Sequence, residues 1–584
     1  MLKKTKIICT VGPSTDAAGI LPTMLNSGMN VARFNFSHGN HADHAQRIAA
    51  VRAAAAEAKR PVALMLDTKG PEMRLGTFKE GKVFLEAGQK FIITGKTVEG
   101  TKDIASVNHK LLPQEVTTGN VILLSDGLVS LVVDRVDGDD IITTVQNSGE
   151  MSDRKRVAAP GISVNLPFLS EQDTDDIKFG IEQGMDCIAA SFVQRAADVL
   201  AIRRILEEAG YDMMIIPKIE NAAGVNNIDE ILKVSDGIMV ARGDLGVEIP
   251  AEEVPIIQKM LIQKCNKAGK PVITATQMLE SMMNNPRPTR AEASDIANAI
   301  YDGTDCIMLS GESASGKYPV EAVQMMAKIA IRTESSLEYK TMLSGRELAQ
   351  AQTTTDAISH ATVQVAYGLQ AAAIITATET GYTARMVSKY RPQAVVVAVT
   401  PNERTLRRLL LYWGVCPLLG PSSKDTDQMV NNAVSRAVSN QLVKDGDLVV
   451  ITAGVPVGTA GTTNMIRVHV VGNILMHGTG IGQKNVTGKI CIATSSKDLE
   501  DKFQPGDILV VAGIDEQSAV YATKAGAIIA EEGGFTSQAA IVGISYGMPV
   551  IVGVDGATER LADGSVVTVD ASRGLVYQGE INAR

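Results

Sequence analysis

The sequence contains no hydrophobic run that approaches the ~20 residues needed to span a bilayer. Its start, Met1 to Lys6, lacks the apolar core of a secretion signal. None of the six cysteines forms a CxxC pair, so buried reduced thiols are favoured over disulfides or zinc ligands. Acidic residues outnumber basic ones, and the net charge of -9 argues against nucleic acid as the main partner. From these absences we expect a soluble, cytoplasmic protein that binds neither membranes nor nucleic acid.

The length of 584 residues exceeds what one hydrophobic core fills and predicts roughly four domains. Eight short apolar runs, typical of strands buried on both faces, alternate with amphipathic helical patterns in the first part of the chain. Strand-helix units repeated eight times predict a (β/α)8 TIM barrel, an α/β fold. The eight runs are 6–11, 29–34, 61–66, 186–190, 213–217, 237–241, 271–274 and 305–309.

Polar residues follow these runs, at the strand ends where a barrel of this kind places its chemistry. In the stretch 215–246, one run leads to Lys218 and Glu220, and the next leads to Arg242 and Asp244. A lysine and two carboxylates at one sheet edge suit a divalent metal and a phosphorylated or enolate-forming substrate. The alternative at this point is a set of charged strand ends without a catalytic role.

About a hundred residues, 70–169, interrupt the barrel pattern with short strand-like pieces separated by turns. They predict a small β-barrel inserted in a βα loop, which could act as a lid that excludes water. The predicted strands are 82–85, 91–94, 121–124, 128–136 and 141–146.

Alternating strands and helices return from about Ser344 and predict an open α/β domain. Its loop 378–383 offers hydroxyls and backbone N–H groups before a helix, which suits a phosphate, although an ordinary turn and helix cap is the alternative. The glycine-rich segment 473–485 predicts a linker. Beyond it, short strands and a helix or two lead to a β-rich end at 566–578.

Six strings resemble the pyruvate kinase family, in that family's order and spacing, and the resemblance covers residues 1 to about 473. They are MNVARFNFSHG (29–39), LDTKGPEMR (66–74), PKIEN (217–221), MVARGDLGVE (239–248), ATQMLESM (275–282) and NPRPTRAE (285–292). The resemblance implies a cytoplasmic homotetramer that uses phosphoenolpyruvate and ADP/ATP in the last step of glycolysis. It also implies four parts: a catalytic barrel (1–69 and 170–343), an inserted lid (70–169), an effector domain (344–473) and an extension (474–584).

By this resemblance, Lys218 supplies positive charge to the moving phosphoryl group and Arg33 grips the substrate phosphate. Glu220 and Asp244 would hold Mg²⁺ (or Mn²⁺). Backbone N–H groups around Gly243 would receive the substrate carboxylate, and the Thr276 hydroxyl would take part in proton delivery. A Schiff base on Lys218 is the alternative chemistry, but the neighbouring Glu220 should keep that lysine charged.

A second ion, K⁺, is implied by hard oxygen ligands that match the family's site: Asn35, Ser37, Asp67 and Thr68. Glu72 matches the residue of K⁺-dependent members, where K⁺-independent ones have a lysine. The implied nucleotide contacts are Asn35, His38, Arg74 and Lys155. The histidines at 38, 41 and 44 form an H-x2-H-x2-H run, but this spacing fans the rings apart and no cysteine accompanies them, so zinc is disfavoured.

The implied effector site comprises Thr378, Thr380, Gly381 and Thr383. Members activated by fructose 1,6-bisphosphate often have a basic residue where Glu379 stands. A carboxylate repels a second phosphate, so we expect a monophosphate such as AMP or ribose 5-phosphate.

The string at 528–554 resembles the swivelling phosphohistidine domain of phosphoenolpyruvate-utilising enzymes. Those domains have a phosphorylated histidine where this chain has Gln538, and an amide cannot serve as that nucleophile. We therefore expect a structural or subunit-contact role for the extension. Two other functions stay open at this stage: a synthase- or dikinase-type phosphotransfer enzyme, and a catalytically silent sensor or scaffold.

Overall fold

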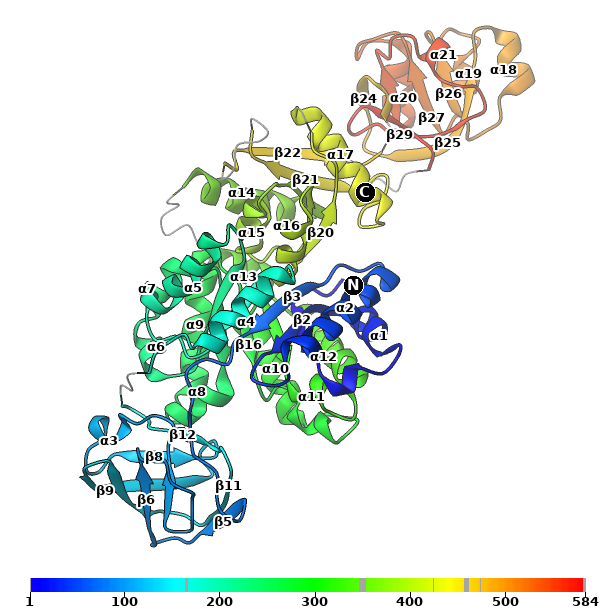
Figure 1. The fold of residues 1–584 in the computed structure, drawn as a ribbon. Coiled ribbons are helices and arrows are strands. Elements are labelled where there is room, and N and C mark those ends of the chain that lie inside the picture. The colour runs from blue at the N-terminus through cyan, green and yellow to red at the C-terminus, as the bar shows by residue number, and fades with distance from the viewer. Residues whose placement is uncertain are drawn as a thin grey trace. The chain divides into compact units, whose positions relative to one another are not determined.

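The computed structural model describes residues 2–162, 166–345, 353–423, 425–455, 462–472 and 474–580 (Figure 1). The described chain forms two compact units. The first holds residues up to 360 together with 378–421, and the second holds 361–377, 422–455 and 463–580. Asn473, where we placed a domain boundary, lies outside the described residues. No helix in the described ranges has the length and apolar character to cross a membrane.

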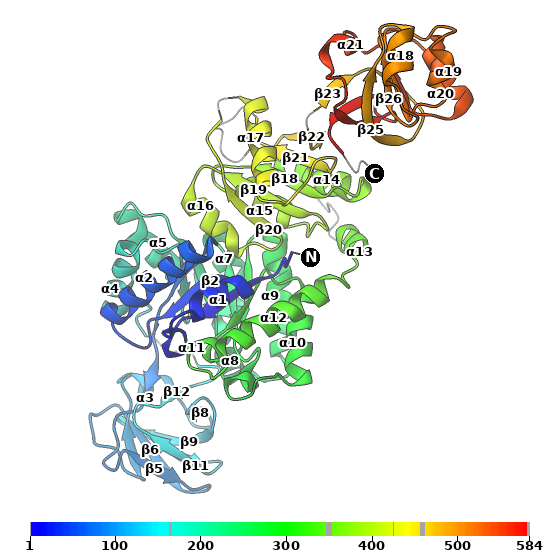
Figure 2. The same ribbon diagram turned by 90° about the vertical axis from the view of Figure 1, so that its right-hand side faces the viewer.

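The first unit contains a closed barrel of eight parallel strands, and each predicted run contributes one of them (Figure 2). The strand order is β1-β17-β16-β15-β14-β13-β3-β2. The prediction of a TIM barrel is confirmed. The strands are β1 (Lys6–Thr10), β2 (Met29–Asn35), β3 (Ala63–Asp67), β13 (Cys187–Ala190), β14 (Met214–Ile219), β15 (Ile238–Ala241), β16 (Val272–Ala275) and β17 (Cys306–Leu309).

Helices surround this barrel, and their starts are encoded locally. Asn40 caps the longest of them in a capping box: its side chain accepts a hydrogen bond from the Asp43 N–H, and the Asp43 carboxylate accepts one from the Asn40 N–H. The helices are α1 (Ile20–Ser27), α2 (His41–Ala58), α4 (Glu171–Glu182), α5 (Ala196–Glu208), α6 (Ala222–Asn226), α7 (Ile228–Val234), α8 (Arg242–Glu248), α9 (Val254–Ala268), α10 (Arg290–Asp302), α11 (Gly311–Ala314), α12 (Pro319–Glu334) and α13 (Tyr339–Gly345).

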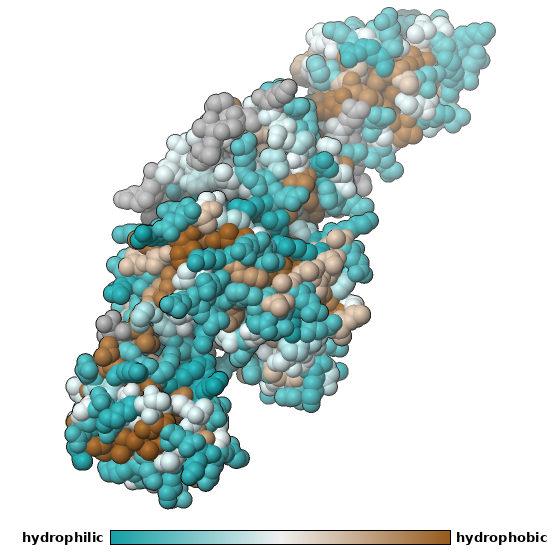
Figure 3. All heavy atoms as spheres, viewed as in Figure 1, coloured by the Kyte–Doolittle hydropathy of each residue, from teal (hydrophilic) through white to brown (hydrophobic). Residues whose placement is uncertain are grey.

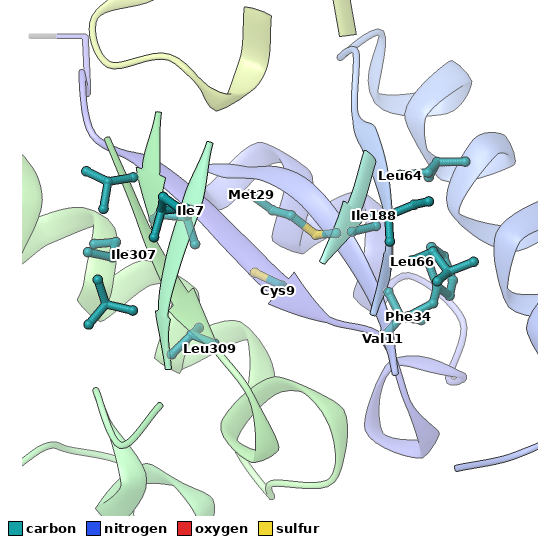
Figure 4. Close-up of a cluster of buried hydrophobic side chains, with 14 of the residues drawn as sticks. Ile7, Cys9, Val11, Met29, Phe34, Leu64, Leu66, Ile188, Ile307 and Leu309 are labelled. Atoms are coloured by element: carbon teal, nitrogen blue, oxygen red, sulfur yellow. The ribbon is translucent and has the colours of Figure 1, made fainter. Parts of the chain in front are cut away.

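The main core lies between strands and helices. Figure 4 shows Ile7 and Cys9 on β1, Phe34 on β2 and Leu66 on β3, all fully buried. Ile48 of α2 belongs to the same cluster. Burial of each such side chain contributes roughly 1.5–3 kcal/mol to the free energy of unfolding. This packing holds the strands in place, and the polar residues that follow them are held at the strand ends.

The insertion in the barrel forms a β domain with its own core, which includes Phe91 and Leu131. A seven-stranded sheet has the order β4-β12-β8-β9-β10-β6-β7. Its two edges meet where Leu75 bridges Val107, and the Gly76 N–H donates to the Ser106 carbonyl at 2.8 Å. The elements are β4 (Met73–Arg74), β5 (Lys82–Leu85), β6 (Lys90–Thr94), β7 (Ile104–Ser106), α3 (Leu112–Glu115), β8 (Val121–Leu124), β9 (Val129–Asp137), β10 (Asp140–Val145), β11 (Gly149–Ser152) and β12 (Arg156–Ala158).

Two buried aspartates at the amino-terminal end of the barrel connect it to residues 378–421 of the same unit. Asp186 accepts hydrogen bonds from the Leu64 N–H of β3 and from Arg407, both at 2.9 Å. Asp305 accepts from the Val272 N–H of β16 and forms a two-pronged pair with Arg391 at 2.8 and 2.9 Å. Each carboxylate therefore joins an arginine to the first residues of a barrel strand.

The remaining elements of the first unit belong to the α/β part, in which β19 and β20 pair in parallel. The alternation of strands and helices that we predicted from about Ser344 is present here. They are α15 (Tyr382–Ser388), β19 (Val395–Thr400), α16 (Glu403–Arg408) and β20 (Val415–Leu419). Helix α14 (Thr354–Gly368) begins in the first unit and ends in the second.

The second unit contains β18 (Ala373–Ala377), α17 (Thr426–Ser439), β21 (Leu448–Ala453) and β22 (Met465–Val470), followed by an eight-stranded sheet in the order β23-β30-β29-β25-β26-β27-β28-β24. Figure 3 shows one face of the molecule, with apolar patches on this sheet domain and on the inserted β domain. The sheet's elements are β23 (Ile474–His477), β24 (Thr479–Ile481), β25 (Asn485–Ile492), α18 (Ser496–Lys502), β26 (Ile508–Val511), α19 (Ala519–Ala522), β27 (Ala527–Ala530), α20 (Gln538–Tyr546), β28 (Val550–Val552), α21 (Ala557–Arg560), β29 (Val566–Asp570) and β30 (Leu575–Gln578).

The predicted linker at 473–485 is wrong over its described residues. β23 and β24 both lie in it, and they pair with β30 and β28. The glycines serve close packing: a Cβ on Gly480 would lie 1.9 Å from the Ala571 carbonyl oxygen. Glycine is required there because another backbone approaches the strand.

Candidate active site at the carboxyl ends of the barrel strands

The centre of the site is Asp67, the last residue of β3, which is 1% exposed. Its Oδ2 accepts from Nε of Arg33 on β2 at 2.5 Å. Its Oδ1 lies 3.3 Å from Nζ of Lys218 on β14. Burial alone would raise the pKa of Asp67, but Arg33 and Lys218 outweigh burial and hold that pKa below its usual range. One carboxylate thus fixes the two cations that we predicted to act on a phosphate.

Lys218 is a buried ammonium with several oxygen partners. Its Nζ donates to the Ser191 hydroxyl at 2.9 Å and lies 2.9 Å from Oε1 of Glu220. Burial would lower the pKa of Lys218, but Asp67 and Glu220 raise it overall. A Schiff base needs a neutral, deprotonated amine, so these neighbours disfavour that chemistry.

Glu220 and Asp244 form the predicted carboxylate pair, and their environments push their pKa values apart. Glu220 is fully buried and its Oε2 accepts the Phe192 N–H at 2.6 Å. Burial, reinforced by Asp244 and opposed by Lys218, raises the pKa of Glu220. Burial would also raise the pKa of Asp244, but Arg156 and Lys218 lower it. Two carboxylates that share one buried region supply the hard oxygen donors that Mg²⁺ prefers, and Oε1 of Glu220 has no aligned hydrogen bond. The residues present therefore fit a divalent ion.

Gly243 and Thr276 meet where α8 begins. The Gly243 N–H donates to the Thr276 hydroxyl at 2.7 Å, and that hydroxyl donates to the Ala275 carbonyl at 2.6 Å. Thr276 and Gln277 adopt positive φ values of 70° and 53°. A β-branched residue rarely adopts this conformation, and such strain is concentrated at functional sites.

The four predicted K⁺ ligands come from β2, β3 and the turns that follow them. Asn35 is paired in register with Asp67, and the Ser37 N–H donates to the Asn35 side-chain oxygen at 3.1 Å. The Thr68 hydroxyl accepts the Ser191 N–H at 3.1 Å. All four positions thus lie on adjoining strand ends, and their oxygens are of the type that K⁺ binds.

The predicted nucleotide contacts are less closely grouped. Arg74 pairs with Glu72 at 2.6 Å. Lys155 is partly exposed, and its carbonyl accepts the Leu75 N–H at 2.9 Å. Among the described residues, no hydrogen bond or ion pair joins Arg74 or Lys155 to His38. Arg74 lies on β4 and Lys155 directly precedes β12, which pairs with β4, whereas His38 follows β2 of the barrel.

The histidines of α2 bind different partners. His41 Nε2 lies 2.6 Å from Asp176, and His44 Nε2 donates to the His38 carbonyl at 2.9 Å. The His44 ring also stacks on Phe36 at 4.1 Å. In the part of the chain that the structure describes, no cluster of three or more histidine, cysteine or acidic side chains could hold a metal ion.

The predicted effector loop is a tight turn that opens α15. The Gly381 N–H donates to the Thr378 hydroxyl at 3.0 Å, and Gly381 has a φ of 83°. The Glu379 carbonyl accepts the Thr405 hydroxyl at 2.8 Å. A hollow beside this loop is lined by Thr380, Asn402 and three arginines of the α16 region.

Two residues close to the centre escaped sequence reasoning. Arg156 of β12 pairs with Asp244, and its only sequence signal is the basic run Arg154-Lys155-Arg156. Phe192 supplies an N–H to Glu220 from a left-handed conformation with a φ of 57°. No sequence pattern indicates that conformation.

Two cations held among three carboxylates at the strand ends of a barrel are suited to the chemistry of a phosphotransfer enzyme. Residues 2–323 match the family described as pyruvate kinase, barrel domain, and residues 356–469 match pyruvate kinase, alpha/beta domain. Residues 503–574 match PEP-utilising enzyme, mobile domain. The chain belongs to the pyruvate kinase family.

Curated relatives named pyruvate kinase resemble this chain over its length. The protein from Geobacillus stearothermophilus is 54% identical over 582 residues, 99% of each chain. The protein from Bacillus licheniformis is 52% identical over 581 residues, again 99% of each. The protein from Staphylococcus epidermidis is 49% identical over 583 residues, 100% of each. The prediction of an enzyme of this family is confirmed.

The role of Asp67 yields a stability prediction. Asp67→Asn leaves the buried Arg33 and Lys218 without their shared counter-ion, which should cost about 3–5 kcal/mol of unfolding free energy at pH 7. Because the folded pKa of Asp67 is lowered, its stabilisation is complete above the unfolded pKa and is lost as the pH falls through the folded one. Urea unfolding at several pH values measures this loss.

Asp16→Asn provides the control, because Asp16 also pairs with an arginine, Arg47, but its side chain is 48% exposed. Its effect should stay within about 0.5 kcal/mol. Equal losses in the two variants would contradict the central role of Asp67.

Proposed function

We propose that this chain transfers the phosphoryl group of phosphoenolpyruvate to ADP and protonates the resulting enolate, which gives pyruvate and ATP. The observation that supports this most strongly is the Asp67 carboxylate, which holds Arg33 and Lys218 beside the Glu220–Asp244 pair. A loose, metaphosphate-like transition state needs fixed positive charge around its equatorial oxygens rather than a protein nucleophile.

Lys218 faces the moving phosphoryl group, and Arg33 binds the substrate phosphate. The raised pKa of Lys218 keeps its ammonium charged throughout turnover. The bond from phosphorus to the enol oxygen breaks, and a terminal phosphate oxygen of ADP forms the new bond to phosphorus. The electron pair left on the enol oxygen makes the enolate, which takes up one proton at its methylene carbon.

Glu220 and Asp244 would hold Mg²⁺ or Mn²⁺ in this reaction. When bound, the ion supplies positive charge to the substrate carboxylate, enol and phosphate oxygens. Backbone N–H groups at the start of α8, around Gly243, would receive the substrate carboxylate, and the Gly243 N–H would exchange its hydrogen bond to the Thr276 hydroxyl for this one. The Thr276 hydroxyl lies within hydrogen-bond reach of Gly243 and would deliver the proton through water.

Asn35, Ser37, Asp67 and Thr68 would hold K⁺ close to the substrate phosphate. We assign the nucleotide phosphates to Arg74 and Lys155, with Asn35 and His38 as further contacts. The Glu72 carboxylate neutralises Arg74, so a monovalent cation restores the positive charge that this pairing removes.

The regulatory part of the proposal concerns residues 344–473. Thr378, Thr380, Gly381 and Thr383 would bind a phosphorylated effector, with AMP or ribose 5-phosphate favoured over fructose 1,6-bisphosphate because of the Glu379 carboxylate. We also propose a cytoplasmic homotetramer with the four parts inferred from the sequence. The free thiols of all six cysteines accord with a reducing compartment.

The match of residues 503–574 to a mobile domain of PEP-utilising enzymes raises a second candidate, phosphotransfer through a phosphohistidine. Gln538 argues against this route. It is the first residue of α20, exposed and preceded by the capping Ser537, and its amide is not a nucleophile. We therefore assign the extension a structural or subunit-contact role.

Lys218→Met tests the central role. Pyruvate formation is measured with a lactate dehydrogenase-coupled assay in the presence of phosphoenolpyruvate, ADP, Mg²⁺ and K⁺. In the variant the rate should fall by at least about 10³-fold, while the circular dichroism spectrum stays unchanged. Retained turnover would refute the assignment. A matched control is Lys264→Met, because this partly exposed lysine pairs with Asp229 on the helical surface and should leave the rate as it is.

A K⁺ titration tests the monovalent site. The wild type should need K⁺, whereas Glu72→Lys should be active in sodium buffer, since a lysine at this position replaces the cation's charge. Full wild-type activity without K⁺ would contradict the prediction.

Effector preference is tested at low phosphoenolpyruvate. AMP or ribose 5-phosphate should change the wild-type rate more than fructose 1,6-bisphosphate does, and Glu379→Lys should increase the response to the bisphosphate. A strong bisphosphate response that is the same in both proteins would refute the role of Glu379.

A further inference from the structure

We propose that Arg156 acts as a tethered cation that competes with the divalent metal for Asp244, so that engagement of the inserted β domain and metal binding oppose one another. This inference rests on the proposed function, because it takes Asp244 as a metal ligand. It assigns a role to a residue that the proposed mechanism does not use.

Arg156 extends from β12 of the inserted domain into the acidic region of the barrel. One of its terminal nitrogens, Nη1, donates to Oδ1 of Asp244. The Arg156 side chain is 9% exposed and the Asp244 side chain is 31% exposed, so the ion pair is buried on the arginine side and partly open to solvent on the aspartate side. The pair joins two parts of the first unit that are 88 residues apart in sequence.

The surroundings of Arg156 are those of a cation site. Besides Asp244, the charges of Glu220, Glu72 and Glu248 act on its guanidinium and favour the charged form. Glu72 lies on the segment that leads into the inserted domain, whereas the other three belong to the barrel. Lys218 also pairs with Glu220 and Arg74 with Glu72, so Arg156 is one of several cations that share these carboxylates, and it is the one that holds Asp244 directly.

Phe192 extends this contact to the second proposed metal ligand. Its ring lies 4.9 Å from the Arg156 guanidinium carbon, and its N–H donates to Oε2 of Glu220 at 2.6 Å. A φ of 57° for a bulky residue is strained, so surrounding contacts must maintain it. Arg156 thus touches Asp244 directly and Glu220 through Phe192.

The competition follows from charge. A guanidinium stays protonated at any physiological pH, so it cannot relieve its repulsion of a divalent ion by losing a proton. Metal binding at Asp244 must therefore weaken the Arg156 pair, and with it a contact that holds the inserted domain on the barrel. Reciprocally, engagement of Arg156 must lower the metal affinity by the same factor.

The experiment uses the full chain, without phosphoenolpyruvate or nucleotide, and Mn²⁺ as the probe. Free Mn²⁺ is measured by electron paramagnetic resonance during a titration. Arg156→Gln should bind Mn²⁺ about tenfold more tightly than the wild type, and Arg156→Lys, which keeps the charge but loses the planar fork, should lie between them. Equal or weaker binding by Arg156→Gln would overturn the inference, since it would make Arg156 an aid to metal binding.

Arg195→Gln is the matched control. Arg195 and Arg156 line one cavity. Arg195 pairs with Asp198, but its side chain is 67% exposed. Its Mn²⁺ affinity should equal that of the wild type. A gain as large as that of Arg156→Gln would reduce the effect to general surface charge and overturn the proposal.

A second measurement needs no variant and covers the case in which Arg156→Gln fails to fold. Saturating Mn²⁺ should accelerate hydrogen exchange of the wild-type β12 amides, because the Arg156 contact is released; unchanged or slower exchange would overturn the inference. If the Mn²⁺ affinities and the hydrogen exchange follow these expectations but the wild type forms no pyruvate, the proposed function alone is refuted. Normal pyruvate formation with unchanged Mn²⁺ affinity in Arg156→Gln would refute this inference alone.

Discussion

The active end of the barrel depends on one buried carboxylate. Asp67 lies between Arg33 and Lys218 and is itself almost inaccessible to water. Without it, Arg33 would be a buried cation with no counter-ion and Lys218 would keep only Glu220, which would cost several kcal/mol of unfolding free energy. Under the proposed function, the atoms of this structural ion network are also those that bind the substrate phosphate.

The barrel could be predicted because its strands are buried on both faces and therefore appear as unbroken apolar runs, each of which appears in the structure. The polar residues after those runs were found for the same reason, since parallel strands bring their carboxyl ends to one edge. Resemblance to a family then assigned chemistry to them. Short strands such as β4 and β12 escaped prediction because two or three residues show no periodicity.

Other features could not be predicted because their causes are not local. Gly480 suggests a loop by composition, yet it is a strand residue that Ala571 approaches closely. Arg156 gives no local sign that it reaches Asp244, because that contact depends on how the inserted domain folds back on the barrel. Phe192 and Thr276 adopt left-handed conformations that their side chains disfavour, and only the tertiary contacts around them account for this.

The aspartates at the opposite end of the barrel have a mechanical consequence. Asp186 grips β3 at Leu64, and the same strand ends at Asp67 three residues later. Asp305 likewise accepts a hydrogen bond from the Val272 N–H at the start of β16, and Thr276 directly follows the end of that strand. A strand rises about 3.3 Å per residue, so each of these short strands connects an aspartate at the amino-terminal end of the barrel to polar residues roughly 10 Å away at the carboxyl end.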